Sequence, residues 1–262
     1  MKVVLFGGGQ GMRLRGYSDE IPKPMVPLGF RPILWHVMKY YAHFGHKDFV
    51  LCLGYQADVI KRFFLEYREE VSNDFVLRGG SHDVELLDSD IRDWTITFVD
   101  TGIHTSIGER LRRVREHVAD EEIFLANYAD GVVDLDHNAY FDSFVASDSV
   151  AGLLAVRPPQ SYHVLHLDDT SRVSGIEPMG ESDIWLNGGF FVLRQEIFDY
   201  IEPGEELVME PFHRLMAERR LYAHRFDGFF APMDTFKDKS RLDKMYEQGA
   251  APWVLWKENG GQ

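Results

Sequence analysis

Short apolar runs alternate with helix-like segments along most of this chain, and this alternation limits the folds that it can adopt. The first apolar run lies at 2–7 and ends at a glycine, and a helical pattern follows at 32–45. Further candidate strands lie at 48–55, 94–102, 122–131 and 148–159, with candidate helices at 56–71 and 108–118. This order predicts an α/β fold with a mainly parallel, mixed sheet and helices on both faces.

Length and composition limit the number of domains and the classes of partner that the chain can have. The 262 residues suit a single domain, 1–262, in which about 205–262 forms a small C-terminal extension packed on the rest. Lys and Arg number 28 and Asp and Glu number 42, so the net charge of −14 argues against nucleic-acid polymers and anionic membranes as partners. Cys52 is the only cysteine, which excludes a disulfide framework. No apolar run reaches the ~18 residues of a membrane span, so we expect a cytoplasmic protein, and we expect it to be a homo-oligomer.

Four glycines, Gly7, Gly8, Gly9 and Gly11, follow the first apolar run and are joined by Arg13. Glycine lets backbone N–H groups come close to a ligand, and the planar guanidinium of arginine suits phosphate oxygens. The loop lacks the Gly-Lys-Ser/Thr of a Walker loop and the spacing of a dinucleotide-binding G-x-G-x-x-G. A glycine cluster is equally typical of an ordinary turn, so these residues alone leave a phosphate loop and a turn as alternatives.

Lys23 lies between two prolines in the segment PKPMVPLG. Pro22 and Pro24 fix φ on both sides of the lysine and favour an extended path. A localised lysine loses about 2 kcal/mol of rotamer entropy, and a stiff backbone directs the side chain to one place without removing that cost. The same residues also fit a surface lysine in a proline-rich turn.

The segments GGGQGMRL and PKPMVPLGFRPILWHVMKYY resemble the sugar-1-phosphate nucleotidylyltransferases. The resemblance continues in order through DFVLCLGYQADVIKRFF, WTITFVDTG, ERLRRV, YADGVVDLD, NGGFFVL, EPF, PMDTFKDK and APWVLW. It implies a Rossmann-like fold of the nucleotide-diphospho-sugar transferase type. It also implies an Mg²⁺-dependent enzyme that takes a nucleoside triphosphate, with CTP favoured, and a sugar 1-phosphate, with glucose 1-phosphate favoured, and releases pyrophosphate.

The resemblance assigns the nucleotide and metal residues one by one. Asp130 and Asp234 match the two metal ligands, and Lys23 and Arg13 complete the implied catalytic set. The residues implied to bind the nucleotide are Phe6, Gly7, Gly8, Gly9, Gly11, Met12, Arg13, Lys23, Arg110 and Asp130. The implied reaction is a direct in-line displacement at the α-phosphate, which needs neither a covalent intermediate nor a general base because the acceptor phosphate is already ionised. Catalysis then consists of positioning and charge stabilisation.

The acceptor side of the implied site is formed by other segments. Asn187 and Glu210 match residues that hydrogen-bond sugar hydroxyls, and Gly188 leaves room beside the sugar ring. His163 stands where the family has a glycine that lines the sugar pocket. Glu177 stands where the family has the lysine that holds the sugar phosphate. A carboxylate facing that phosphate would be repelled by about 1 to 4 kcal/mol for unit charges at ~4 Å.

Other departures from the family pattern keep alternatives open. Met12 replaces a threonine in the glycine loop, and Ala129 replaces a glycine beside the metal-binding turn. With His163 and Glu177, these changes favour the same chemistry on a different phosphorylated sugar, cyclitol or small alcohol. A further alternative is a catalytically degenerate relative that only binds nucleotide, which the retained Lys23 and the two aspartates argue against.

Overall fold

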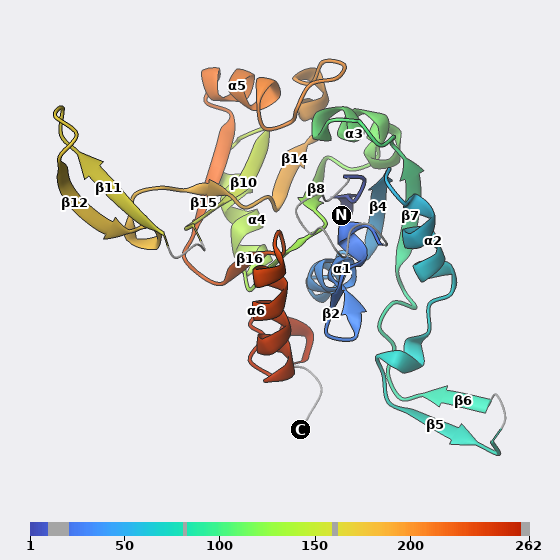
Figure 1. The fold of residues 1–262 in the computed structure, drawn as a ribbon. Coiled ribbons are helices and arrows are strands. Elements are labelled where there is room, and N and C mark those ends of the chain that lie inside the picture. The colour runs from blue at the N-terminus through green and yellow to red at the C-terminus, as the bar shows by residue number, and fades with distance from the viewer. Residues whose placement is uncertain (10–20, 81–82, 159–161, 258–262) are drawn as a thin grey trace.

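An eight-stranded mixed sheet forms the centre of the computed structural model, which describes residues 1–9, 21–80, 83–158 and 162–257 (Figure 1). Its strands follow the order β13-β10-β14-β8-β1-β4-β7, and β15 also pairs with β10. They are β1 (Lys2–Phe6), β4 (Asp48–Leu53), β7 (Thr95–Asp100), β8 (Ile123–Tyr128), β10 (Ala151–Val156), β13 (Leu186–Asn187), β14 (Phe191–Arg194) and β15 (Leu221–Phe226). β1 is paired in parallel with both β4 and β8, whereas β14 is antiparallel to β8 and β10. The predicted α/β fold with a mixed, mainly parallel sheet is therefore confirmed.

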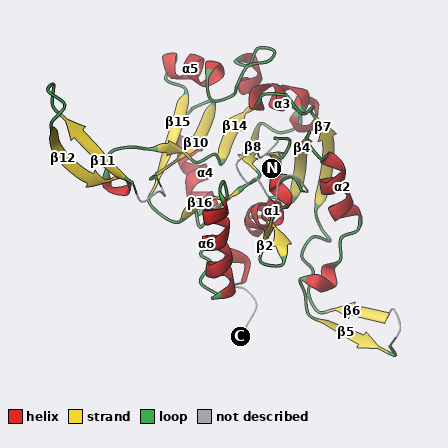
Figure 2. Cartoon of the chain, viewed as in Figure 1, coloured by secondary structure: helices red, strands yellow, loops and turns green. Residues whose placement is uncertain are grey.

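Helices and small ribbons surround this sheet (Figure 2). The helices are α1 (Ile33–His43), α2 (Ala57–Leu65), α3 (Ile107–Arg113), α4 (His137–Ala146), α5 (Glu210–Ala217) and α6 (Phe236–Glu247). The small strands pair as β2 (Pro27–Leu28) with β3 (Arg31–Pro32), β5 (Phe75–Arg78) with β6 (Asp83–Leu86), β9 (Gly131–Val133) with β16 (Phe230–Pro232), and β11 (His163–Leu167) with β12 (Val173–Pro178). Short 3₁₀ helices are η1 (Lys23–Met25), η2 (Glu69–Val71), η3 (Arg115–Val118), η4 (Met179–Glu181), η5 (Gln195–Asp199) and η6 (Leu255–Lys257).

The two faces of the sheet carry separate apolar cores. Successive residues of β1 point to opposite faces, so Val3 and Leu5 join one core cluster while Val4 and Phe6 join the other. The first cluster also contains buried residues of α1, α2 and α4, and the second contains those of α3 and α5. Each large aliphatic side chain buried in this way contributes about 1.5–3 kcal/mol. Helices on both faces, as the strand–helix alternation predicted, are confirmed.

The ends of the first two helices can be compared with the ends that the sequence predicts. α1 stops shortly before Gly45, whose φ of +86° suits glycine, as the sequence indicated. The second expected helix, 56–71, is shorter than predicted because α2 ends at Leu65. Beyond it Arg68 adopts an extended backbone, and its carbonyl accepts a hydrogen bond from Arg31 Nη2 at 2.7 Å. The same carbonyl also accepts from Val71 N at 3.3 Å, so the chain continues in the short helix η2 instead of α2.

The C-terminal segment takes part in both the sheet and the surrounding ribbons. β15 pairs in parallel with β10, and β16 pairs with β9 so that Pro232 lies opposite Gly131. Thr235 begins α6 with a capping box in which Asp238 is the reciprocal partner. The segment expected as an extension, about 205–262, thus supplies a strand of the central sheet as well as α6. The assignment of one domain over 1–262 stays a prediction.

Two hairpins extend away from the sheet on opposite sides of the molecule (Figure 1). One is β5–β6, which exposes Phe75 and Leu77, and the other is β11–β12, which exposes Leu165 and Ile176. Within the described residues, none of the helices is long and apolar enough to cross a membrane.

Candidate active site

The glycine loop begins where β1 ends, at the carboxyl edge of three parallel strands. Gly7 N donates to Cys52 O at 3.0 Å, and Gly8 O accepts from Tyr55 N at 3.2 Å, so both glycines are held against the end of β4. A Cβ on Gly8 would lie 2.0 Å from Arg110 Nη1, so a side chain there would have to displace the buried guanidinium from its hydrogen bonds. The predicted nucleotide residues Gly11, Met12 and Arg13 lie outside the described residues.

Arg110 supports this loop from α3. Its guanidinium donates to Gly8 O and Ile103 O, both at 3.2 Å, and to Thr101 Oγ1 at 2.7 Å. The side chain is only 2% exposed, and burial lowers its pKa. Arg110 therefore fixes the backbone of Gly8 and places a positive charge beneath the loop, while neutral oxygens satisfy its donors. Its neighbours Arg112 and Arg113 instead form ion pairs with Glu109, as expected of residues outside the site.

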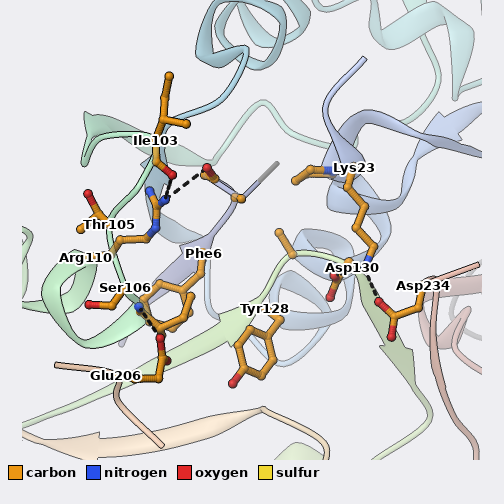
Figure 3. Close-up of a pocket in the computed structure, with 16 residues that line it drawn as sticks. Phe6, Lys23, Ile103, Thr105, Ser106, Arg110, Tyr128, Asp130, Glu206 and Asp234 are labelled. Carbon is orange, nitrogen blue, oxygen red and sulfur yellow. Dashed lines mark hydrogen bonds and ion pairs between the residues drawn. The ribbon is translucent and has the colours of Figure 1, made fainter. Parts of the chain in front are cut away.

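Lys23 lies between the two aspartates predicted to bind metal (Figure 3). Its Nζ is 2.5 Å from Asp130 Oδ2 and 2.5 Å from Asp234 Oδ1. Burial opposes the charged form of Lys23, but the attraction and hydrogen bonds of Asp130 and then Asp234 outweigh it and raise the lysine pKa above its usual 10.5. The 3₁₀ turn η1, closed by Met25 N donating to Pro22 O at 2.8 Å, holds the backbone of Lys23. The structure thus brings together three residues that the sequence places far apart.

Each aspartate is positioned by regular structure. Asp130 follows β8, whose last residue Tyr128 is paired with Phe6 of β1. Asp234 follows β16, and Met233 N donates to Asp130 O at 2.8 Å, so the β9–β16 ribbon keeps the two segments adjacent. The ribbon therefore explains why the PMDT segment meets the YADG segment.

The two carboxylates fit a hard divalent cation. Their oxygens converge on the Lys23 ammonium, 2.5 Å from each, so a divalent cation held between them would take the place of that ammonium. Mg²⁺ prefers one or two carboxylates and completes its shell with water and phosphate oxygens. The described residues contain no group of three or more His, Cys, Asp or Glu side chains that could share a metal. Asp130 and Asp234 with a phosphate ligand are thus the donor set that Mg²⁺ prefers.

A cavity of about 460 Å³ runs from the glycine loop to these aspartates (Figure 3). One part of it is lined by Phe6, Gly7, Gly8, Gly9 and Lys23, which the resemblance assigns to the nucleotide. The other residues that line the cavity come from several segments, among them the loop before α3 and the loop before α5. These further lining residues are Pro24, Ile103, Thr105, Ser106, Ile107, Arg110, Tyr128, Ala129, Asp130, Glu206 and Asp234.

A second cavity of about 500 Å³ adjoins the first. Tyr128, Asp130 and Asp234 line both cavities, so the two meet at the aspartates. Asn187 and Gly188, both predicted on the acceptor side, line the second cavity. Asn187 Nδ2 lies 3.5 Å from Tyr128 Oη, and a Cβ on Gly188 would crowd Val156 at 3.0 Å. The arrangement offers two ligand sites with one shared point between them.

Three predicted acceptor residues line neither of these two cavities. His163 and Glu177 belong to the projecting β11–β12 hairpin, where Glu177 Oε1 lies 2.8 Å from His166 Nε2. Glu210 is exposed at the first residue of α5. In the structure Glu177 therefore faces a histidine, whereas alignment of single residues on Pro178 suggested that it faces the acceptor. The roles of these three residues stay predictions.

Sequence reasoning also missed residues that line the first cavity. Glu206 occupies a loop without a recognisable motif, and only the fold brings it to the cavity. Tyr128 could have been identified, because it lies in the predicted strand 122–131, two residues before Asp130.

Comparisons with known proteins agree with this architecture. The family model described as nucleotidyl transferase matches residues 2–230. A glucose-1-phosphate cytidylyltransferase of Salmonella typhi is 39% identical over 98% of this chain and all of its own length. A probable glucose-1-phosphate cytidylyltransferase of Bacillus subtilis is 32% identical over the same shares. Among solved structures, HddC from Yersinia pseudotuberculosis superposes with a TM-score of 0.67 at 20% identity, covering 94% of this chain and 99% of its own. A UDP-glucose pyrophosphorylase complexed with UDP-glucose gives 0.68 at 14% identity, covering 95% and 98%.

Proposed function

The chain belongs to the nucleotidyl transferase family, and from this premise we propose that it joins a nucleoside monophosphate from a nucleoside triphosphate to a sugar 1-phosphate and releases pyrophosphate. CTP and glucose 1-phosphate are the favoured substrates, because the relatives that match over the full chain are named for them. The observation that carries the proposal is the junction of the two cavities. There Lys23, Asp130 and Asp234 converge, and a nucleotide on one side would meet an acceptor on the other.

The reaction follows from the charges at this junction. An oxygen of the sugar phosphate forms a bond to the α-phosphorus, and the bond from that phosphorus to the bridging oxygen of the β-phosphate breaks, so that pyrophosphate leaves with the electron pair. No proton has to be removed, because the attacking phosphate is already ionised. Lys23 would donate to phosphate oxygens and offset their charge as it develops. Asp130 and Asp234 would hold Mg²⁺, which when bound supplies the positive charge that two approaching phosphates require.

The second cavity provides groups for a sugar acceptor. The Asn187 side chain and the Tyr128 hydroxyl can exchange hydrogen bonds with sugar hydroxyls. The absent side chain of Gly188 lets the backbone beside them pack closely on Val156. Glu177 is paired with His166 on the hairpin. The position of Glu177 therefore does not support the repulsion that the sequence suggested between this residue and the acceptor phosphate.

The test is an assay of pyrophosphate release with a matrix of substrates. CTP, UTP, dTTP, ATP and GTP are each paired with several sugar 1-phosphates, with and without Mg²⁺, and products are identified by mass spectrometry. We expect CDP-glucose from CTP and glucose 1-phosphate, and loss of turnover when EDTA removes the metal. Pyrophosphate release with a different acceptor only would replace the proposed acceptor, and binding of nucleotide without any product would indicate a non-catalytic relative. The predicted cytoplasmic location and homo-oligomeric state stay predictions.

A further inference from the structure

From the walls of the first cavity we infer that Glu206 selects the nucleobase, with its carboxylate accepting a hydrogen bond from the exocyclic amino group of cytosine. The inference rests on the proposed function, because it assumes that this cavity holds the nucleoside triphosphate. It adds a residue that no sequence motif indicates, and it gives a physical reason for a preference for CTP over UTP.

The position of Glu206 follows from the polarity of the cavity. The reacting phosphate belongs at the end where Lys23, Asp130 and Asp234 lie, since the acceptor cavity opens there. Figure 3 shows Ser106 and Glu206 on the opposite side of the cavity from Lys23 and Asp234. A nucleotide whose α-phosphate lies at the junction must extend its nucleoside into the remaining space. The base therefore lies toward the Ser106 and Glu206 end.

The walls of that end suit a flat pyrimidine ring. Phe6, Ile103 and Ile107 supply apolar surface along the cavity. A base needs such surface for its faces and a few placed polar groups for its edge. Glu206 supplies the carboxylate among the lining residues at this end, and it comes from the loop before α5.

Glu206 is held in place yet keeps acceptor capacity. Its Oε2 accepts from Ile107 N at 3.2 Å, which fixes the half-buried side chain in the wall. In the part of the chain that the structure describes, Oε1 has neither a hydrogen bond nor an ion pair. An ionised carboxylate only accepts hydrogen bonds. Cytosine presents an amino group at the position where uracil and thymine present a carbonyl oxygen. The carboxylate thus binds the edge of cytosine and faces an acceptor in uracil.

The variant Glu206→Gln tests this assignment at nearly constant volume. The amide can donate to the uracil O4, so the preference for CTP over UTP should fall by about tenfold or more, in both Kd and kcat/KM. Glu202→Gln is the matched control, because Glu202 is an exposed glutamate four residues earlier that does not line the cavity. The control should keep the parent's preference, and melting temperatures of all three proteins check the fold.

Calorimetric binding of CTP, UTP, GTP and 2′-deoxy-CTP separates this inference from the proposed function. A parent that binds CTP about tenfold tighter than UTP, with the preference lost only in Glu206→Gln, supports the inference whether or not turnover is observed. Turnover by the parent with an unchanged CTP preference in the variant overturns the inference and leaves the proposed function intact. A parent that prefers UTP or GTP, or binds none of these nucleotides, also overturns it. So does a variant that alters only the ratio of CTP to 2′-deoxy-CTP, which would place Glu206 at the ribose.

Discussion

Replacing Lys23 by alanine separates the electrostatic role of this residue from a structural one. The two carboxylate oxygens lie 2.5 Å from Nζ, so they are at most ~5 Å apart. Unit charges at that separation repel by about 1 kcal/mol in water and about 3 kcal/mol in a partly buried site. Removing the ammonium leaves this repulsion without compensation, and it also removes a fixed positive charge from the reacting phosphates. Loss of such a group costs about 3 kcal/mol in the barrier, or roughly a hundredfold in kcat.

Two measurements on Lys23→Ala follow from these magnitudes. We expect kcat for pyrophosphate release to fall roughly a hundredfold, while Mg²⁺ raises the melting temperature of the variant more than that of the parent, because the ion relieves the repulsion between Asp130 and Asp234. Lys47→Ala removes an exposed lysine that pairs with Asp93 and serves as the control. A melting temperature that collapses together with activity, even in excess Mg²⁺, would refute the reasoning and favour a structural role. Turnover close to that of the parent would refute it as well.

Three further predictions concern the aspartates, the glycine loop and a buried histidine. Asp130→Asn and Asp234→Asn should each abolish Mg²⁺-dependent turnover with the fold intact by circular dichroism, and near-parental turnover at limiting Mg²⁺ would contradict the assignment. Gly8→Ala should lower the melting temperature and weaken nucleotide binding, since its Cβ would lie 2.0 Å from Arg110 Nη1. Burial and then nearby His46 lower the pKa of His137 to about 3, below its unfolded value. Stability should therefore fall as the pH drops below about 6.5, by up to ~1.4 kcal/mol per pH unit from this group; urea unfolding from pH 7 to 5 measures it, and His137→Phe should flatten the slope.

The sequence predicted those parts of the fold that depend on local pattern. The alternation of apolar runs and helical segments was sufficient for the α/β class. The resemblance carried by the PKP, YADG and PMDT segments pointed to Lys23, Asp130 and Asp234, and the structure brings these three residues together. The helical pattern at 56–71 did not reveal that α2 ends at Leu65, beyond which Arg68 adopts an extended backbone and contacts Arg31.

The acceptor side shows the same limit. Glu177 aligns with a family lysine along the chain, but strand pairing places it on a hairpin beside His166. Glu206 lies in an unremarkable loop sequence and reaches the cavity only because α3 and the loop before α5 pack together. Pairing between distant segments decides where both residues lie in space, and local sequence signals carry no information about that pairing.

One apolar cluster connects the three backbone segments that carry the junction residues. Lys23 is separated from Asp130 and Asp234 by 107 and 211 residues. Val26, Val132 and Met233, each within three residues of one of them, are buried together with Trp253. The geometry of the two carboxylates around the ammonium therefore depends on packing beneath the β9–β16 ribbon as well as on the central sheet. Because Trp253 comes from the C-terminal segment, that segment packs beneath the ribbon and helps to hold it in place, although no residue beyond Asp234 lines the two cavities within the described chain.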